Sequence, residues 1–507
     1  MTADRLVEAS TCLGCGCACD DIAVVARGDR IVEARNACEL GAAWFGDGSA
    51  PARSRFQGRD VPVDDALDAA ARLLARAARP LIYLAPDISC EVQRQGIAMA
   101  DALRATLDSV TSATAMSSII AAQERGRAGA TLGEVRNRAD LLVFWGVDPM
   151  LRYPRYWTRY APEPAGLHVP DGRRSRTIVA VDVGGSHGPA DADVRIALAE
   201  EDEVAMLSEL SAIVADPDRL KTDAMHDDTV RLPPSRAKRA SASLAPAIRE
   251  ADRQAALPGR VAARPDGGGG GKADATYDTA QLARELAPTL LAARYVVFVA
   301  DAESRPEERA LHIDRSADAE LDRGRADALV ALTQALNGPT RCALSLLRAG
   351  GNRSGADAVA TWQTGYPAAV DFARGHPRYR PLDGTAGARL ARGEVDAVLI
   401  VGSAAGVPAE LLDRIARLPC ALVGPRASES ALAQAEVVID TGVAGIHEGG
   451  LALRMDDMPL SLRPSVSGPP SAAGLVASLR DKAVRYRDTL RFKYPKKPPR
   501  SPTGHPA

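Results

Sequence analysis

Residues 141–149 are Leu-Leu-Val-Phe-Trp-Gly-Val-Asp-Pro, five apolar residues followed by a Gly-Val-Asp-Pro turn. A short apolar run that ends in turn-forming residues is typical of a strand buried on both faces. Helical stretches such as 64–79 and 91–107 alternate with such runs, so the sequence predicts an α/β fold with helices on both faces of parallel sheets. The other runs are 80–85, 177–182, 295–300, 397–402, 421–424 and 437–440.

The chain has 507 residues, which is too long for one ordinary core. Apolar residues make up 46% and charged residues 25%, as in soluble globular proteins. The 63 basic and 65 acidic residues nearly cancel, so no overall field favours nucleic acid or a membrane. The N-terminus has no apolar signal region and no apolar run is long enough to span a bilayer, so we expect a cytoplasmic protein.

Composition divides the chain into five parts. Five consecutive glycines at 267–271 and a proline-rich basic tail are typical of segments that form no core. The two α/β parts predict two doubly wound halves around a cleft, with ligands beyond the carboxyl ends of the strands. The predicted parts are a cysteine-cluster β-hairpin unit (1–58), a first α/β domain (59–215), a flexible low-complexity insertion (216–278), a second α/β region (279–490) and a disordered tail (491–507).

Five of the eight cysteines lie between positions 12 and 38. Cys12, Cys15 and Cys19 have C-x2-C-x3-C spacing, and a hairpin centred on residues 28–29 would return Cys38 to them. Four thiolates can hold an iron–sulfur cluster or a zinc ion, and the spacing does not choose between the two. Cys17, between the second and third of these cysteines, would not be a metal ligand. A set of buried free thiols is the alternative, and the isolated Cys90, Cys342 and Cys420 indicate core positions.

Several motifs, in order along the chain, resemble the B subunit of formylmethanofuran dehydrogenase, a member of the molybdopterin oxidoreductase superfamily. The resemblance covers the chain except for the 216–278 insertion and roughly the last fifteen residues. The segments that carry it are 12–22 (CLGCGCACDDI), 131–140 (TLGEVRNRAD), 145–150 (WGVDPM), 153–156 (YPRY), 351–355 (GNRSG), 362–367 (WQTGYP), 370–379 (VDFARGHPRY), 445–450 (GIHEGG) and 454–460 (RMDDMPL).

The resemblance implies a [4Fe–4S] cluster at the four cysteines. It also implies loops that approach a bis-pterin guanine dinucleotide cofactor. Glycines in such loops allow a phosphate close to the backbone, and a carboxylate can accept from guanine; ordinary strand-end turns are the alternative explanation. The residues concerned are Gly146, Asp148, Pro149, Asp182 and Gly402, with His447 either facing the same cleft or serving as a hydrogen-bonded structural histidine.

The sequence departs from the family at the metal ligand. Active members have a cysteine or selenocysteine followed by a histidine just upstream of the 131–140 motif. Here residues 111–123 contain neither, and Thr114 stands about where the thiolate would be. A hydroxyl is a poor substitute for a thiolate on tungsten or molybdenum. We therefore expect no molybdopterin or tungstopterin cofactor and no catalytic residue in this chain.

This departure is similar to the variant in the bacterial formyltransferase/hydrolase complex of tetrahydromethanopterin-linked C1 metabolism. The resemblance implies that amidohydrolase-like A, C and formyltransferase-like D subunits pass a formyl group to a methanofuran-type carrier and release it as formate. This chain would be their non-redox structural B subunit. The alternative is an active formylmethanofuran dehydrogenase subunit whose tungsten or molybdenum takes another ligand.

Three arginines remain to be explained. Arg152, Arg155 and Arg159 recur at intervals of three and four residues. Such a row could bind an anionic carrier tail, and a solvated helix face explains it equally well.

Overall fold

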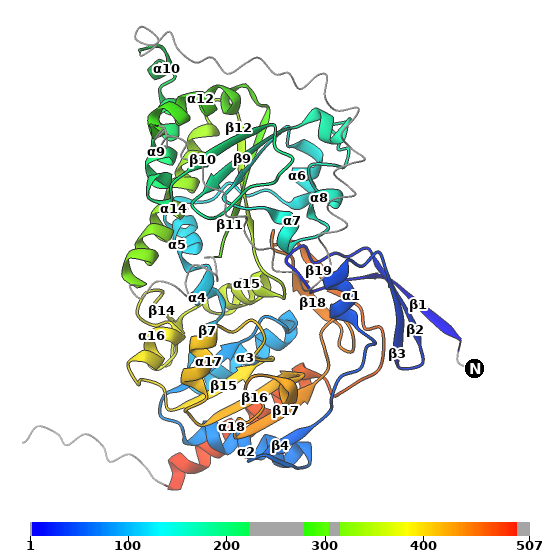
Figure 1. The fold of residues 1–507 in the computed structure, drawn as a ribbon. Coiled ribbons are helices and arrows are strands. Elements are labelled where there is room, and N and C mark those ends of the chain that lie inside the picture. Colours follow the sequence, from blue (N-terminus) through cyan, green and yellow to red (C-terminus); the bar gives the residue numbers. More distant parts are fainter. Residues whose placement is uncertain (1–2, 223–277, 304–314, 494–507) are drawn as a thin grey trace, which may run out of the picture.

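A computed structural model describes residues 3–222, 278–303 and 315–493 of the chain. Two large α/β sheets lie one beyond the other, and a small three-stranded sheet lies at their side (Figure 1). The predicted α/β class is confirmed. Within the described residues, no helix combines the length and the apolar character that a bilayer span requires.

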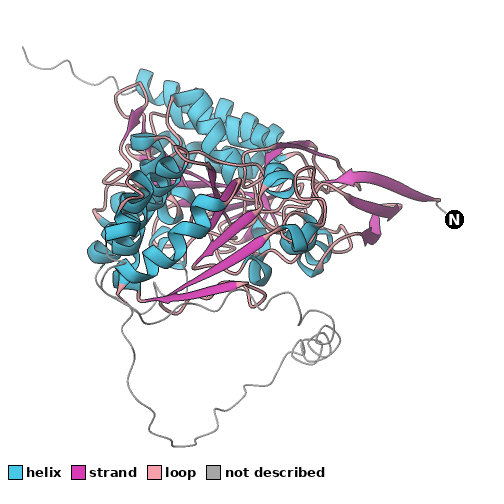
Figure 2. Ribbon diagram, turned by 90° about the horizontal axis from the view of Figure 1, so that it is seen from above, coloured by secondary structure: helices cyan, strands magenta, loops and turns pink. Residues whose placement is uncertain are grey.

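The three-stranded sheet has the order β1-β2-β3 and is antiparallel. Its strands β2 and β3 form the hairpin predicted around Gly28, which has a φ of +61°. The strand that leads from the N-terminus projects from the main body in both views (Figures 1 and 2). The elements are β1 (Asp4–Ser10), β2 (Ile22–Arg27), β3 (Arg30–Arg35) and the helix α1 (Glu39–Phe45), which starts directly after Cys38.

The five-stranded sheet is parallel throughout and has the order β10-β9-β8-β11-β12. The helices α5, α9, α12 and α14 cover one face, and α6 and the cysteine segment cover the other. Its strands are β8 (Leu141–Trp145), β9 (Thr177–Val183), β10 (Val194–Leu198), β11 (Tyr295–Asp301) and β12 (Arg341–Leu347). The helices are α5 (Met116–Arg125), α6 (Leu132–Arg138), α9 (Glu203–Ala215), α12 (Thr279–Ala292) and α14 (Arg315–Leu336), with the short α4 (Thr111–Thr114), α7 (Pro149–Arg152), α8 (Tyr156–Arg159) and α10 (Arg219–Thr222) nearby.

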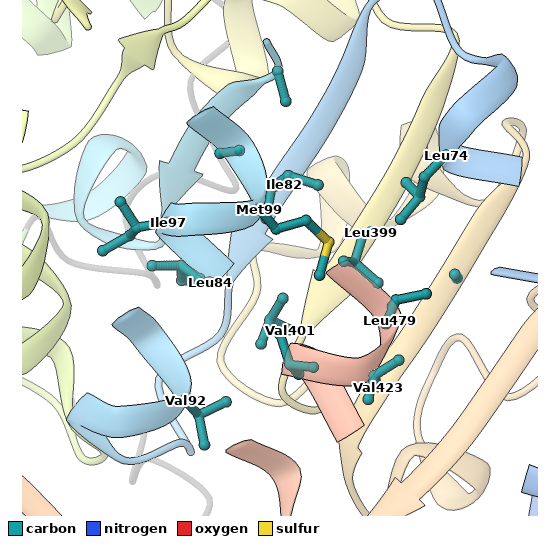
Figure 3. Packing of buried hydrophobic residues seen from close by; sticks show 14 of the residues in the cluster. Leu74, Ile82, Leu84, Val92, Ile97, Met99, Leu399, Val401, Val423 and Leu479 are labelled. Atoms are coloured by element: carbon teal, nitrogen blue, oxygen red, sulfur yellow. The ribbon is translucent and has the colours of Figure 1, made fainter. Parts of the chain in front are cut away.

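The nine-stranded sheet has the order β14-β13-β7-β6-β15-β16-β17-β4-β5, with five parallel central strands and antiparallel pairs at each edge. Apolar side chains of α2, α3, α15 and α18 bury one face, part of which Figure 3 shows around Met99 and Leu399, and α16 and α17 bury the other. The central strands are β7 (Thr106–Ser109), β6 (Pro80–Leu84), β15 (Ala397–Val401), β16 (Cys420–Pro425) and β17 (Val437–Thr441). The edge strands are β4 (Ser54–Phe56), β5 (Arg59–Asp60), β13 (Val370–Asp371) and β14 (Arg378–Tyr379). The helices are α2 (Val63–Arg76), α3 (Cys90–Ala102), α15 (Arg353–Thr364), α16 (Ala386–Ala391), α17 (Ala409–Ile415) and α18 (Ala472–Lys493), and a separate hairpin joins β18 (Gly450–Leu453) to β19 (Pro459–Leu462).

The two predicted α/β ranges, 59–215 and 279–490, do not each form a sheet of their own. Strand β6 pairs with β15, and β8 pairs with β11, so each sheet takes strands from both ranges. The chain therefore passes several times between the five-stranded and the nine-stranded sheet. The part of the insertion at 223–277 and the tail from 494 lie outside the described residues, while α18 continues to Lys493.

One predicted helix is too long. The sequence predicts a helix over 91–107, but α3 stops at Ala102 and Thr106 begins strand β7. Arg104 makes the break with a φ of +50°. A non-glycine residue in that region gives no recognisable stop signal in a sequence.

Candidate functional site

The carboxyl ends of the strands in the two large sheets face each other. Arg348 directly follows β12 of the five-stranded sheet and donates to the Thr111 hydroxyl, just beyond β7 of the nine-stranded sheet, at 2.8 Å. The backbone N–H of Asn352 donates to the carbonyl oxygen of Pro86, which follows β6, at 2.5 Å. Strand order reverses between β8 and β11 in one sheet and between β6 and β15 in the other. Ligands bind at such points in open α/β sheets, so this junction is the candidate site.

The cysteine loop between β1 and β2 brings the predicted thiols together. Cys12, Cys15 and Cys19 are buried and Cys38 is half-buried. Burial raises the pKa of Cys12 to about 12, and the neighbouring thiols that add to this shift are those of Cys15, Cys19 and Cys38. A Cβ placed on Gly41 would lie 3.4 Å from the Cys12 sulfur and 3.9 Å from the Cys38 sulfur. The start of helix α1 therefore lies against both Cys12 and Cys38, close enough for a Cβ at Gly41 to contact the two sulfurs.

The fifth cysteine of the cluster takes a different place. Cys17 is fully buried, and its thiol interacts with that of Cys15. This interaction lowers the pKa of Cys15 and raises that of Cys17. Among the described residues, no three Cys, His, Asp or Glu side chains are grouped tightly enough to hold a single metal ion. In a cubane cluster each thiolate binds a different iron, so the donors surround a larger body.

Two of the three arginines identified in the sequence connect this loop to the five-stranded sheet. Arg155 makes two bonds of 2.6 Å to the Asp21 carboxylate, and Arg159 reaches Asp20 at 2.5 Å. Arg159 also interacts with the thiol of Cys19; burial raises the pKa of this thiol, and the guanidinium opposes that shift. Arg152 pairs with Asp301 at the end of β11. The three side chains are thus engaged within the chain rather than forming a solvated helix face.

The position of the expected metal ligand is occupied by hydroxyls with partners of their own. The Thr114 hydroxyl donates to the carbonyl oxygen of Val110 at 3.0 Å. The Thr111 hydroxyl accepts from Arg348. Neither side chain offers the soft donor that a heavy redox metal requires.

Four charged side chains, three buried and one half-buried, lie beside these hydroxyls. Arg348, which is 8% exposed, donates to Asp357 of α15 at 2.5 Å and lies 3.5 Å from Glu303, beyond β11. Arg353 lies 3.4 Å from the same glutamate oxygen. Burial raises the pKa of Asp357, while Arg348 opposes the shift. No pattern in the sequence marks this group, because its members come from separate segments and each is ordinary by itself.

A cavity of about 390 Å³ opens next to the charge group, within the usual range for small-molecule pockets. Helices α5 and α15 and the loop after β18 form its walls. Its two arginines both pair with carboxylates of the lining, Arg348 with Asp357 and Arg127 with Asp457 at 3.5 Å. The remaining lining residues are Ala115, Ser118, Ile119, Ala122, Gln123, Ala302, Leu346, Ser354, Thr361, Gly365, Pro367 and Met455.

The residues predicted for the cofactor fall into three places. Gly146, Asp148 and Pro149 follow β8, and Asp182 lies near the end of the adjacent β9. Asp148 caps α7 by accepting from Met150 N at 2.9 Å, and burial raises its pKa. Burial also works to raise the pKa of Asp182, but the Gly188 N–H and the guanidinium of Arg195 hold it below its usual value.

The other two predicted residues lie apart from these. Gly402 ends β15 with a φ of +114°, and a Cβ there would come within 2.7 Å of Asp87. That half-buried aspartate accepts from the N–H of Ser403 at 3.0 Å, and the sequence patterns do not single it out. His447 accepts from Val443 N at 3.1 Å through Nδ1 and lies 2.7 Å from the carbonyl oxygen of Gly48 through Nε2. Both ring nitrogens are engaged, as expected of a structural histidine.

Comparison with known proteins places this geometry in context. No protein-family model matches the chain. It is 28% identical over 476 residues to the B subunit of the tungsten-containing formylmethanofuran dehydrogenase 2 of Methanocaldococcus jannaschii, covering 92% of this chain and 95% of that protein. The protein of the same name from Methanococcus maripaludis is 27% identical over 470 residues, covering 90% and 93%.

The fold also matches a solved structure. A chain in the formyltransferase/hydrolase complex of Methylorubrum extorquens, determined with methylofuran, superimposes with a TM-score of 0.61 at 22% identity. The match covers 85% of this chain and 99% of that one. At this level of identity the comparison shows a shared fold.

Proposed function

Since the chain is a homologue of the formylmethanofuran dehydrogenase B subunit, we propose that it is the corresponding subunit of a formyltransferase/hydrolase complex in C1 metabolism linked to tetrahydromethanopterin and methanofuran. Its partners are amidohydrolase-like A, C and formyltransferase-like D subunits and a methanofuran-type carrier. The partner subunits transfer the formyl group and release it as formate. This chain is their non-redox structural subunit.

One observation carries the structural role. Residues 111–123 offer no thiolate and no imidazole, and the hydroxyls of Thr111 and Thr114 already bind Arg348 and Val110. A subunit that reduced carbon dioxide at a heavy metal would need a soft donor and a neighbouring base at this point.

The residues at the junction also fit a bis-pterin dinucleotide cofactor poorly. Its pyrophosphates need cations or free backbone N–H groups. Arg348 and Arg127 are each neutralised by an aspartate, and the Ser403 N–H at the end of β15 is bonded to Asp87. Asp182, suited to guanine, is paired with Arg195.

The cysteine loop, in contrast, fits a four-thiolate group. Cys12, Cys15, Cys19 and Cys38 would hold a [4Fe–4S] cluster, because their thiols lie around that of Cys12 and each could bind a different iron. The cationic Arg155 and Arg159 lie beside Cys19 and would offset the negative charge of an iron–sulfur centre. When bound, the cluster would cross-link the loop between β1 and β2 to helix α1.

The proposal is tested by assembling the chain with purified A, C and D subunits and assaying two reactions. We expect a stable complex that releases formate from the formylated pterin donor and shows no reduction of carbon dioxide with a low-potential electron donor. Reduction of carbon dioxide that depends on this chain would favour the alternative, an active dehydrogenase subunit. A chain that does not join the complex would reject the structural role.

A further inference from the structure

The loop that carries the cysteines touches the wall of the cavity through a single glycine. A Cβ on Gly16 would lie 2.0 Å from the carbonyl oxygen of Arg348 and 3.0 Å from the sulfur of Met455. Met455 N also donates to the carbonyl oxygen of Gly16 at 3.2 Å. Gly16 lies between Cys15 and Cys17, and both Arg348 and Met455 line the cavity.

A second contact runs between the same two loops. The N–H of Gly351 donates to the carbonyl oxygen of Leu13 at 3.0 Å. A Cβ on Gly350 would lie 2.7 Å from the carbonyl oxygen of Gly14. The loops therefore meet backbone to backbone, with no flexible side chain between them to absorb a displacement.

Residues 348–352, at the far end of these contacts, are hydrogen-bonded to segments beyond β6 and β7 and to strand β18. Asn352 is fully buried; its amide nitrogen donates to the carbonyl oxygen of Ile88 at 3.0 Å, and its amide oxygen accepts from Leu453 N at 2.8 Å. Arg348, at the start of the loop, binds Asp357 and Thr111. A shift of residues 348–352 must therefore change the charge group and the floor of the cavity.

From these contacts we propose that occupancy of the four-cysteine site sets the shape of the central cavity, through Gly16 acting on Arg348 and Met455. When metal occupies the four-cysteine site, the cysteine loop is fixed, and Gly16 then holds the Arg348 carbonyl and the Met455 side chain in place. An empty site releases the loop, and the cavity walls formed by residues 346–357 and 453–458 loosen with it. The link is reciprocal, so a ligand in the cavity tightens the cysteine site by the same factor. This inference rests on the metal site assigned above.

Hydrogen exchange of the assembled complex, measured by mass spectrometry, tests the coupling. Removing the metal with a chelator under anaerobic conditions should speed exchange about tenfold in 346–357 and 453–458. Helices α2 and α18, which pack against each other on the outer face of the nine-stranded sheet, should be unchanged. Faster exchange confined to residues 11–21 would overturn the inference.

A variant tests the same link without removing metal. Gly16→Ala should speed exchange in the same two segments even in complex whose metal content is confirmed by elemental analysis, because the added methyl displaces the Arg348 carbonyl. Gly387→Ala is the matched control, since nothing lies within 4 Å of a Cβ at that helical position. Wild-type exchange in Gly16→Ala would refute the coupling. A purified complex with neither iron nor zinc would reject the metal assignment and the coupling with it, whereas assembly with the A, C and D subunits tests the proposed function separately.

Discussion

The cysteine loop and the central junction lie in direct contact, but their polar side chains are arranged differently. In the loop, the thiols of Cys12, Cys15, Cys19 and Cys38 gather near one another with arginines beside them. At the junction, Thr111, Arg348 and Asp357 bind one another. The four thiols of the loop are thus free to serve as ligands under our proposal, whereas the polar side chains at the junction satisfy one another. Conservation of a fold and conservation of each site within it are separate matters.

Removing a thiol from the loop should have the largest effect. Cys15→Ser should lose most of the bound metal, lower the free energy of unfolding by about 3 kcal/mol or more, and weaken assembly. Metal analysis and chemical denaturation measure these changes. The hydrolase activity of the separate partner subunit should stay intact. Cys420→Ala, at an isolated buried thiol, serves as the control and should keep its metal. Wild-type metal content in Cys15→Ser would refute the ligand assignment.

Breaking the charge group at the junction should come next. Arg348→Met leaves Glu303 and Asp357 buried beside one fewer cation, and we expect a loss of about 3 kcal/mol in urea unfolding. Arg127→Met breaks a more exposed pair with Asp457 and should cost about 0.5 kcal/mol. Similar small losses in both variants would show that the buried group does not hold the two sheets together.

Replacing Asp87 should change the free energy of unfolding by a smaller amount, and this change should depend on pH. Burial raises the pKa of this carboxyl in the folded protein, so the folded state binds its proton more tightly than the unfolded state does. Its contribution to stability therefore falls as pH rises from the unfolded value of about 3.8 through the folded one. Asp87→Asn does not titrate, so its stability relative to the wild type should increase over that window and then level off. A difference independent of pH would contradict the assignment.

The smallest effect should follow a change at Thr114, where the sequence led us to expect a metal ligand in active members of the family. Thr114→Ala removes one hydroxyl hydrogen bond to Val110 and should cost less than about 1 kcal/mol. Formyl transfer and formate release by the assembled complex should be unchanged. A tenfold fall in either rate, in a variant that still assembles, would show that this residue takes part in the chemistry.

The cysteine loop and the central junction also differ in how far the sequence could predict them. The cysteine site lies within 27 residues, so spacing and one hairpin were enough to bring Cys12 and Cys38 together. The apolar runs likewise predicted seven strands of the two large sheets, but they missed β7, β10 and β12 and gave no strand partners. Strand β6 pairs with β15 more than 300 residues later, and a parallel pair leaves no local turn to mark it. Glu303, Arg348 and Asp357 meet only because β11, β12 and α15 converge, which no single segment encodes.

The central claim is that this subunit holds no heavy redox metal, and elemental analysis of the assembled complex tests it most directly. Iron, zinc, tungsten and molybdenum should be measured together with the pterin released on denaturation. We expect roughly four iron atoms per copy of the chain, as one cubane cluster requires, with only traces of tungsten, molybdenum and pterin. Tungsten or molybdenum bound in proportion to the chain, together with pterin, would contradict it.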